Sequence, residues 1–331
     1  MVALDDLAII TVSTNEAHWL RPCLSTVFDH LGDIRADVVV VDNESHDETS
    51  QLVATEFPDA RVVRCQNHGF SHANNRALMS VHSRYVLFLN PDTEIVDGTF
   101  AELVAAMDAR PTVGLIGVLQ VDKDDVLDPT IRRFPNALRA LGDALAVDRW
   151  PVRPKLFGER EMDLGVYQTE VSCDWVSGSF MLARREAIDS AGFLDERYFM
   201  YSDETDLCRR IKTAGWEVRN LPAMKIIHHG KTQLSAKIES LGAFTRMAYA
   251  RKHFSPVHRA AYVGAIFARH GVRAIAPGGG EKGRHRRDVN RTVIKTMLGR
   301  APVPYAALTS PVSVTTGTPE HRGARLESIE A

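Results

Sequence analysis

Residues 37–45 read DVVVVDNES, a run of four valines that ends in a cluster of polar side chains. A short run of β-branched residues without polar alternation is typical of a strand buried on both faces of a parallel sheet. Similar runs occupy residues 7–12 (LAIITV) and 85–89 (YVLFL), and helical spacing of apolar residues covers residues 17–31 and 71–81. This alternation predicts a doubly wound α/β sheet with ligands beyond the carboxyl ends of its strands.

The composition of the 331 residues divides the chain into three parts. We expect a catalytic domain over residues 1–250, with a nucleotide-binding half over about 1–121 and an acceptor half over about 122–250. Residues 251–300 are predicted to form a basic, amphipathic helical extension. Residues 301–331 are predicted to be a disordered tail.

Charge is distributed unevenly along the chain, whose formal net charge is −2. Residues 251–300 contain 12 basic and 2 acidic side chains, whereas residues 1–250 carry a net charge of −11. An acidic body repels an anionic substrate unless a cation mediates, and a basic segment is attracted to anionic lipid headgroups. We therefore predict peripheral membrane contact through residues 251–300. The alternatives are a solvated basic helix face, or helices packed on the catalytic domain or on a second subunit of a homo-oligomer.

The cysteines and the apolar pattern indicate the compartment. No run of about 18 uncharged apolar residues occurs, and the N-terminus lacks a basic region followed by an apolar one. The cysteines are widely spaced without a CxxC pair, which indicates neither a zinc site nor a disulfide framework; they are Cys23, Cys65, Cys173 and Cys208. We expect a cytoplasmic protein that is peripheral at the inner face of the membrane, with no nucleic-acid partner.

Polar residues follow two of the predicted strands directly. Asp42 follows the valine run, where its carboxylate can accept hydrogen bonds from a ribose or base, although an Asp here can equally form a turn or cap a helix. Asn90 and Asp92 follow residues 85–89, with a proline between them. Oxygen ligands held in this way suit Mg²⁺ or Mn²⁺ bridging a diphosphate. A plain Asn-Pro turn is the alternative.

Two further motifs lie in the second half of the chain. YSDETDLCRR, residues 201–210, places Asp203, Glu204 and Asp206 at the start of a predicted helix. Their mutual repulsion favours a raised pKa and a general base, whereas a structural role at the helix N-terminus is the alternative. IIHHG, residues 226–230, places two histidines after a short apolar strand, where one can bind a metal and favour Mn²⁺.

The order of these motifs resembles that of the family 2 glycosyltransferases with the GT-A fold, and particularly their bacterial rhamnosyltransferase-like branch. The resemblance covers about residues 7–254. Besides the histidine-bearing strand, it rests on IITVSTN, VVVVDNESHDET, NHGFSHANN, YVLFLNPDTEI, WVSGSFMLARREA and GFLDERYFMYSDETDLCRR. It implies a Rossmann-like, mainly parallel sheet flanked by helices, followed by the C-terminal helical extension.

The resemblance also implies roles for individual residues. The nucleotide-sugar contacts it implies are Ser13, Asp42, Asn75, Asn90 and Asp92. It implies that Asp92 and His228 bind the divalent cation, and that Trp175, Gly178 and Asp206 contact the acceptor. The family's base motif has Glu and Asp in the reverse order here. Matching by position gives the catalytic base as Glu204, whereas matching by residue type gives Asp203.

The activity that these features predict is inverting glycosyl transfer. The resemblance implies rhamnose from dTDP-rhamnose as the donor, and a glycan or polyprenyl-linked glycan of cell-envelope polysaccharide synthesis as the acceptor. The alternatives are another nucleotide sugar (galactofuranose or N-acetylglucosamine), a nucleotidyltransferase, and an inactive sugar-nucleotide-binding scaffold. Residues 11–21 contain no glycine, which argues against the phosphate loop expected of a nucleotidyltransferase.

Overall fold

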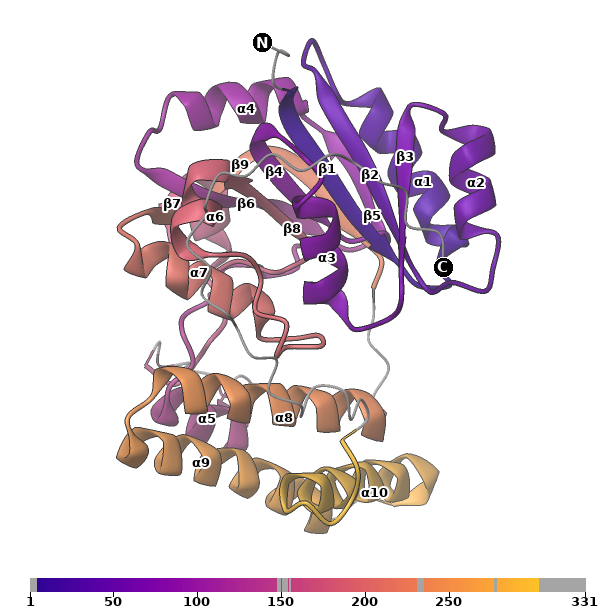
Figure 1. Cartoon of the computed structure of the whole chain (residues 1–331). Coiled ribbons are helices and arrows are strands. Elements are labelled where there is room, and N and C mark those ends of the chain that lie inside the picture. The colour runs from indigo at the N-terminus through magenta and orange to yellow at the C-terminus, as the bar shows by residue number, and fades with distance from the viewer. Residues whose placement is uncertain are drawn as a thin grey trace, which may run out of the picture.

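The computed structural model describes residues 5–147, 150, 154, 156–230, 235–276 and 279–303. Figure 1 shows two layers of structure: a β-sheet flanked by helices, and below it a helical layer formed by α5, α8, α9 and α10. No helix within the described ranges has both the length and the apolar character needed to cross a membrane.

The first half of the sheet is parallel and follows the predicted alternation of strands and helices. Strand order is β3-β2-β1-β4, with β1 paired in parallel to both β2 and β4. Val38 to Val41 are buried at the centre of β2, which confirms a strand covered on both faces. The elements are β1 (Asp5–Ser13), α1 (Ala17–Asp29), β2 (Ala36–Asn43), α2 (Thr49–Glu56), β3 (Ala60–Cys65), α3 (Phe70–Leu78) and β4 (Ser83–Leu89).

Beyond β4 the sheet is mixed and continues in the order β8-β6-β9-β5, with β7 paired to β9. Strand β8 runs antiparallel to both β4 and β6, and β6 runs parallel to β9. The carboxyl ends of β4 and β9 therefore lie at the same edge of the sheet. The bounds are β5 (Thr93–Asp97), β6 (Val113–Val121), β7 (Val171–Ser172), β8 (Phe180–Arg184) and β9 (Glu217–His228).

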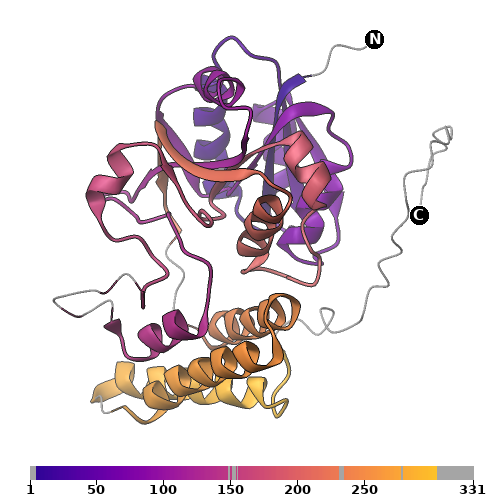
Figure 2. The ribbon, with the colours of Figure 1, turned by 90° about the vertical axis from the view of Figure 1, so that its left-hand side faces the viewer.

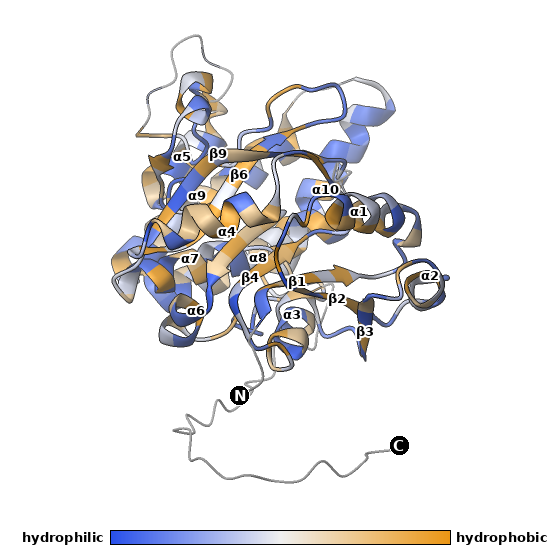
Figure 3. Cartoon of the chain, turned by 90° about the horizontal axis from the view of Figure 1, so that it is seen from above, coloured by the Kyte–Doolittle hydropathy of each residue, from blue (hydrophilic) through white to orange (hydrophobic). Residues whose placement is uncertain are grey.

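Helices cover both faces of this sheet, and each face has its own apolar core. Figure 3 shows the hydrophobic strands in the interior, enclosed by helices of mixed polarity. One core contains side chains of α1, α2 and α4 (Phe100–Asp108), whose start is fixed by a capping box between Thr99 and Glu102. The other contains side chains of α3, α6 (Arg185–Ala191) and α7 (Asp203–Thr213).

The helical layer is a separate packing unit, seen from the side in Figure 2. Its core consists of the buried side chains Ala140, Ala243, Ala250, Tyr262, Ala265, Ile266 and Val293. Helix α8 begins before the boundary that composition placed at residue 250, and it packs with α9 and α10. The bounds are α5 (Ala137–Ala144), α8 (Ala236–His253), α9 (Pro256–Ile275) and α10 (Gly280–Met297).

The apolar face predicted on α9 is mostly used inside this layer. Ile266 is buried in its core, Val263 and Phe267 are half-buried, and Val272 is exposed. The helices therefore pack on one another and on α5, an arrangement that was not among the alternatives considered for this segment. Almost all of the predicted disordered tail lies outside the described residues.

Candidate active site

A cavity of about 490 Å³ lies at the carboxyl edge of the sheet. Val12 lies near the end of β1 and Thr14 follows that strand, Asn90 and Asp92 follow β4, and His228 ends β9. Its other polar walls come from residues 177–179, which precede β8, and from the first turn of α7. The structure thus brings together six of the predicted site residues: Asn90, Asp92, Gly178, Asp203, Glu204 and His228.

Asp92 and His228 meet because strands β5 and β9 are antiparallel and pair Thr93 with His228. The Oδ1 atom of Asp92 lies 3.3 Å from Nε2 of His228. The amide nitrogen of Gln120 lies 3.2 Å from the other ring nitrogen, Nδ1, and this contact sets the ring orientation. Asn90 completes the group, with its amide nitrogen 3.4 Å from the His228 Nε2 atom.

The structure separates the two histidines of the IIHHG motif. His229 Nε2 lies 2.6 Å from a carboxylate oxygen of Glu94, and its ring stacks on Trp19 with centroids 4.7 Å apart. His228 lines the cavity, whereas His229 does not. His228 is therefore the histidine placed to bind a ligand, and His229 joins β9 to α1.

Asp92 and His228 fit the divalent cation that the sequence predicts. They supply one oxygen and one nitrogen ligand, a donor set suited to Mn²⁺. A Cβ atom at Gly230 would lie only 2.3 Å from Oδ2 of Asp92, so the absence of a side chain at Gly230 keeps that oxygen open. No group of three or more such ligands occurs within the described ranges. Mg²⁺ and Mn²⁺ sites that use few protein ligands are commonly completed by substrate phosphates.

Asp203 and Glu204 form a hydrogen-bonded pair of carboxyl groups at the start of α7. Burial and the neighbouring charge of Glu204 raise the pKa of Asp203 well above its usual value. Burial also raises the pKa of Glu204, but the hydrogen bond from Asp203 and the positive charge of Arg132 oppose that shift. Burial therefore raises the pKa of both carboxyl groups, and the pair titrates as a unit that favours a state with one shared proton.

The backbone before this pair has an uncommon conformation. Tyr201 and Ser202 have φ angles of +70° and +66°, in the left-handed region that residues other than glycine seldom adopt. Such conformations cost of order 1–3 kcal/mol each and cluster at functional sites. Here they turn the chain from the cavity wall at Tyr201 directly into the first turn of α7.

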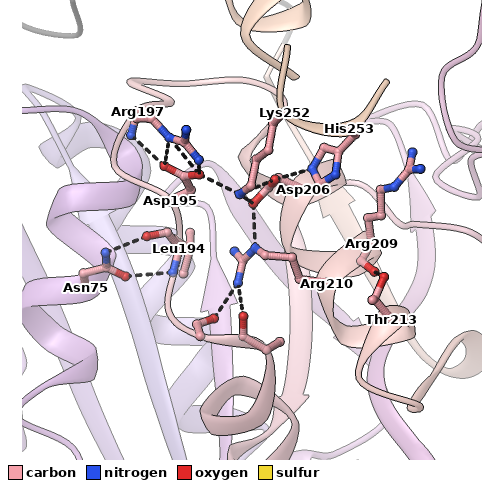
Figure 4. Close-up of polar contacts among 12 residues, drawn as sticks. Asn75, Leu194, Asp195, Arg197, Asp206, Arg209, Arg210, Thr213, Lys252 and His253 are labelled. Atoms are coloured by element: carbon pink, nitrogen blue, oxygen red, sulfur yellow. Dashed lines mark hydrogen bonds and ion pairs between the residues drawn. The ribbon is translucent and has the colours of Figure 1, made fainter. Parts of the chain in front are cut away.

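Asp206, predicted as an acceptor contact, has a different environment. It is fully buried and does not line the cavity. Figure 4 shows its carboxylate between Arg210, Lys252 and His253, with His253 Nε2 at 2.6 Å and Arg210 Nε at 2.7 Å. Lys252 also donates to Asp195 at 2.6 Å. Asp206 therefore joins α7 to α8, and this placement gives no support to the predicted acceptor contact.

The predicted nucleotide contacts near β1 to α3 also lie outside the cavity lining. Asp42 accepts hydrogen bonds from the Ser45 backbone and from the Ser50 hydroxyl. The Asn75 side chain is bonded to the backbone of Leu194, as Figure 4 shows, and to the carboxylate of Glu196. These bonds tie α3 to the loop between α6 and α7. Ser13 is fully buried, and its hydroxyl has no partner among the described residues.

Trp175, predicted as part of the acceptor platform, supports the cavity wall from behind. It is 7% exposed and donates from Nε1 to the carbonyl of Arg133 at 2.9 Å. Its ring lies beneath the guanidinium of Arg132, at 5.4 Å. Gly178 lines the cavity itself, and a Cβ atom there would reach ordinary contact with Glu204 at 3.6 Å.

Glu16 and Gln120 are polar residues of the site that the sequence did not predict. Glu16 lines the cavity, where burial and the charge of Asp92 raise its pKa to about 7. Gln120 is a buried polar residue in an apolar strand, and it contacts Ser179, Asp128 and His228. The interrupted apolar pattern of residues 113–121 was the available signal for Gln120. No sequence signal distinguishes Glu16 from an ordinary residue before a helix.

Comparison with known families and curated proteins gives concordant results. Residues 8–191 match the family model described as glycosyl transferase family 2. An N-acetylglucosaminyl-diphospho-decaprenol L-rhamnosyltransferase of Mycobacterium tuberculosis is 31% identical over 204 residues, 58% of this chain. The match spans 66% of that relative, slightly under two thirds of its length. Rhamnosyltransferase WbbL of Escherichia coli is 24% identical over 229 residues, 67% of this chain and 82% of the relative.

Solved structures share the fold at low sequence identity. A mannosyltransferase from Pyrobaculum calidifontis, in complex with GDP-Man and Mn²⁺, aligns with a TM-score of 0.53 and 16% identity, covering 90% of this chain and 88% of that one. TarS of S. aureus in complex with UDP-GlcNAc aligns with a TM-score of 0.50 and 13% identity, covering 88% and 81%. These likenesses confirm the GT-A fold. Because the family model matches more than half of its residues, this chain belongs to glycosyl transferase family 2.

Proposed function

We propose that the chain is an inverting glycosyltransferase that moves a sugar from a nucleoside diphosphate donor to an acceptor hydroxyl. The observation that carries this proposal is one cavity that contains both a carboxylate–imidazole pair, Asp92 and His228, and a proton-sharing pair, Asp203 and Glu204. A single displacement inverts the anomeric centre and needs only one base, unlike the two carboxylates of a retaining hydrolase.

Each pair has a distinct role in this proposal. The ionised Glu204 accepts the proton of the acceptor hydroxyl, while Asp203 keeps its own proton and donates a hydrogen bond to Glu204. Gly178 leaves room beside Glu204 for the acceptor. Asp92 and His228 would hold Mn²⁺ or Mg²⁺, which when bound supplies positive charge that stabilises the departing nucleoside diphosphate.

The proposed donor is dTDP-rhamnose, and the proposed acceptor is a polyprenyl-linked glycan of the cell envelope. Support comes from the two curated relatives, which are rhamnosyltransferases, one of them named for a diphospho-decaprenol acceptor. The same cavity also suits another nucleotide sugar, because its described lining does not distinguish between hexoses.

The experiment is a donor panel with Mn²⁺, in which free nucleoside diphosphate and sugar transfer are both measured. Sugar transfer, or slow donor hydrolysis without an acceptor, is the expected result, and it should be fastest with dTDP-rhamnose. Faster turnover of UDP-N-acetylglucosamine or UDP-galactofuranose would replace the proposed donor. Release of inorganic diphosphate would indicate a nucleotidyltransferase, and donor binding without turnover would indicate a scaffold.

Membrane contact through the helical layer is also proposed, on electrostatic grounds. Helix α10 exposes Lys282, Arg284, Arg291 and Lys295. Each cation close to an anionic surface contributes about 1 kcal/mol to binding. Because the apolar face of α9 packs mostly within the layer, these cations are the main support for the contact.

A further inference from the structure

A second cavity, of about 450 Å³, lies outside the candidate active site. It is bounded by the segment that precedes and begins α5, by the C-terminal half of α7, and by the junction of α8 and α9. It shares no lining residue with the active-site cavity. No carboxylate belongs to its described lining, and the charged or titratable side chains there are Arg139, Arg209, Lys212, His253 and His258.

Two of these cations keep donor capacity that the described chain does not use. The Nε atom of Arg139 is buried and has no hydrogen-bond partner within the described ranges, although Nη1 donates to the carbonyl of Phe134. Arg209 donates from Nη1 to the hydroxyl of Tyr249 at 3.0 Å, but it forms no ion pair with any described residue, so its other N–H groups keep donor capacity. Its guanidinium packs over the rings of Phe134 and Phe254, at 5.5 and 5.9 Å, and Figure 4 shows it pointing away from Asp206.

The nearest carboxylates are already engaged behind the cavity wall. Asp206 is bonded by Arg210, Lys252 and His253, so it is neutralised by its own partners. Asp174 accepts a hydrogen bond from the Phe134 backbone at 2.8 Å and is 3.7 Å from Nζ of Lys212. The cavity is therefore surrounded by more positive than negative charge.

We propose that this second cavity binds a phosphate or diphosphate group. Planar guanidinium groups recognise phosphate oxygens through paired N–H donors, and the aromatic contacts of Arg209 hold its guanidinium in a fixed position before a ligand arrives. The cavity volume accommodates an anion of this size.

The position of the second cavity on α7 indicates that the bound anion is part of the acceptor, an inference that rests on the proposed function. Helix α7 borders both cavities, and Arg209 follows Glu204 by five residues, a rise of about 8 Å along the helix. The diphosphate of a lipid-linked acceptor is one source of the anion, and a free phosphate or diphosphate is the other. Phe134 and Phe254 offer apolar contacts to the lipid-linked form only.

The test is calorimetric titration of the full chain with inorganic diphosphate in EDTA, which prevents metal-dependent binding of diphosphate in the active-site cavity. Arg139→Gln with Arg209→Gln is expected to weaken binding at least tenfold. Arg251→Gln removes one charge from an exposed position on α8 and should leave binding unchanged. Lys212→Gln, measured separately, preserves the aromatic contacts of Arg209, so it tests the site even where the double variant unfolds.

Two outcomes would overturn the site: no diphosphate binding by the wild-type chain in EDTA, or equal binding by wild type and all cavity variants. Farnesyl diphosphate distinguishes the sources, because tighter binding than inorganic diphosphate indicates a lipid-linked anion and equal binding a free one. Donor hydrolysis without an acceptor is measured in parallel with Mn²⁺. If the wild-type chain shows no donor hydrolysis, the proposed transferase function is wrong. The diphosphate titrations would still show whether the second cavity binds an anion.

Discussion

At the scale of single residues, Asp92 is the most informative position in the candidate site. Its carboxylate is paired with His228 and kept accessible by Gly230. We expect Asp92→Ala to reduce turnover at least 100-fold, because loss of the carboxylate weakens cation binding and the stabilisation of the leaving group. The check is the initial rate against Mn²⁺ concentration, with Asp124→Ala, an exposed carboxylate, as the control. Full turnover in EDTA would contradict the cation requirement.

The Asp203 and Glu204 pair allows a sharper test of the base. Glu204→Gln should lower kcat by several orders of magnitude with little change in donor binding, because an amide cannot accept the proton. Asp203→Asn should be milder, since its amide nitrogen can still donate a hydrogen bond to Glu204. The values of kcat and donor KM for both variants show which of the two carboxyl groups is the base. A severe Asp203→Asn defect beside a mild Glu204→Gln one would reverse the assignment.

The same pair predicts the pH dependence of turnover. Glu204 must be ionised to act as the base, and its pKa is raised above the ordinary value of 4.5. Turnover should therefore fall on the acid side at a pH above 4.5. A pH profile of kcat checks this, in a range where circular dichroism shows the protein to be folded. If turnover falls only below pH 4.5, burial does not raise the pKa of the Glu204 carboxylate.

At the level of helices and strands, Asp206 joins α7 to the helical layer. Burial alone would raise its pKa, but the hydrogen bond from His253 and the charges of Arg210 and Lys252 outweigh burial and hold the pKa below its usual value. A carboxylate with a depressed folded-state pKa stabilises the fold above its unfolded pKa, near 4, and loses that contribution as the pH falls further.

Asp206→Asn is therefore expected to destabilise the protein by about 3 kcal/mol at pH 7, because it leaves buried cations without their counter-charge. Urea unfolding measures the change, and the loss should shrink as the pH falls below about 4. Asp288→Asn, an exposed carboxylate on α10, provides the matched control. Equal stabilities for the two variants would mean that the ion cluster contributes little.

His270 predicts a second pH effect, within the helical layer. It lies between α9 and α10, donates from Nδ1 to Asn290 at 2.8 Å, and has its pKa lowered to about 4 by burial. The imidazole of His270 binds a proton near pH 6.5 in the unfolded chain, whereas in the folded chain it stays neutral down to about pH 4. Stability should therefore fall by up to about 3 kcal/mol between pH 6.5 and 4. His270→Gln, which keeps a donor, should remove this part of the dependence in urea unfolding.

At the scale of the whole molecule, an acidic catalytic body is joined to a basic helical layer. We expect the protein to sediment with anionic vesicles at low salt and to be released at high salt, since the attraction decays over a Debye length of about 8 Å at physiological ionic strength. Lys282→Glu with Arg284→Glu and Lys295→Glu should abolish sedimentation. Lys123→Glu on the sheet layer should not change it.

For membrane binding, charge reversal on α10 is a better test than removal of all residues after Ser255. Truncation would remove α9 and α10 and expose the core side chains of α8, such as Ala243 and Ala250. Newly exposed apolar surface promotes binding to many surfaces, whereas the exposed cations of α10 can be changed without disturbing that core. Protein that stays in the supernatant at low salt would contradict the membrane proposal and favour an oligomer interface.

The alternation of strands and helices in the first half of the sheet can be predicted from the amino-acid sequence alone. Each strand there is a continuous apolar run, because it is buried on both faces, and this local pattern needs no knowledge of distant residues. The same reasoning placed Asp92 at the functional edge, since it directly follows such a strand. The apolar pattern gives no signal for α5, whose eight residues lie in a stretch without apolar periodicity and pack on α9, far along the chain.

Which of two adjacent candidate residues faces the cavity depends on the tertiary structure. Sequence could not separate His228 from His229, because the choice depends on the pairing of β5 with β9 and on Glu94. It could not choose between Asp203 and Glu204 as the base, because pKa values depend on burial and on charges brought from other elements. Local patterns therefore predicted polar side chains at the ends of strands, whereas the orientation and protonation of those side chains depend on long-range packing.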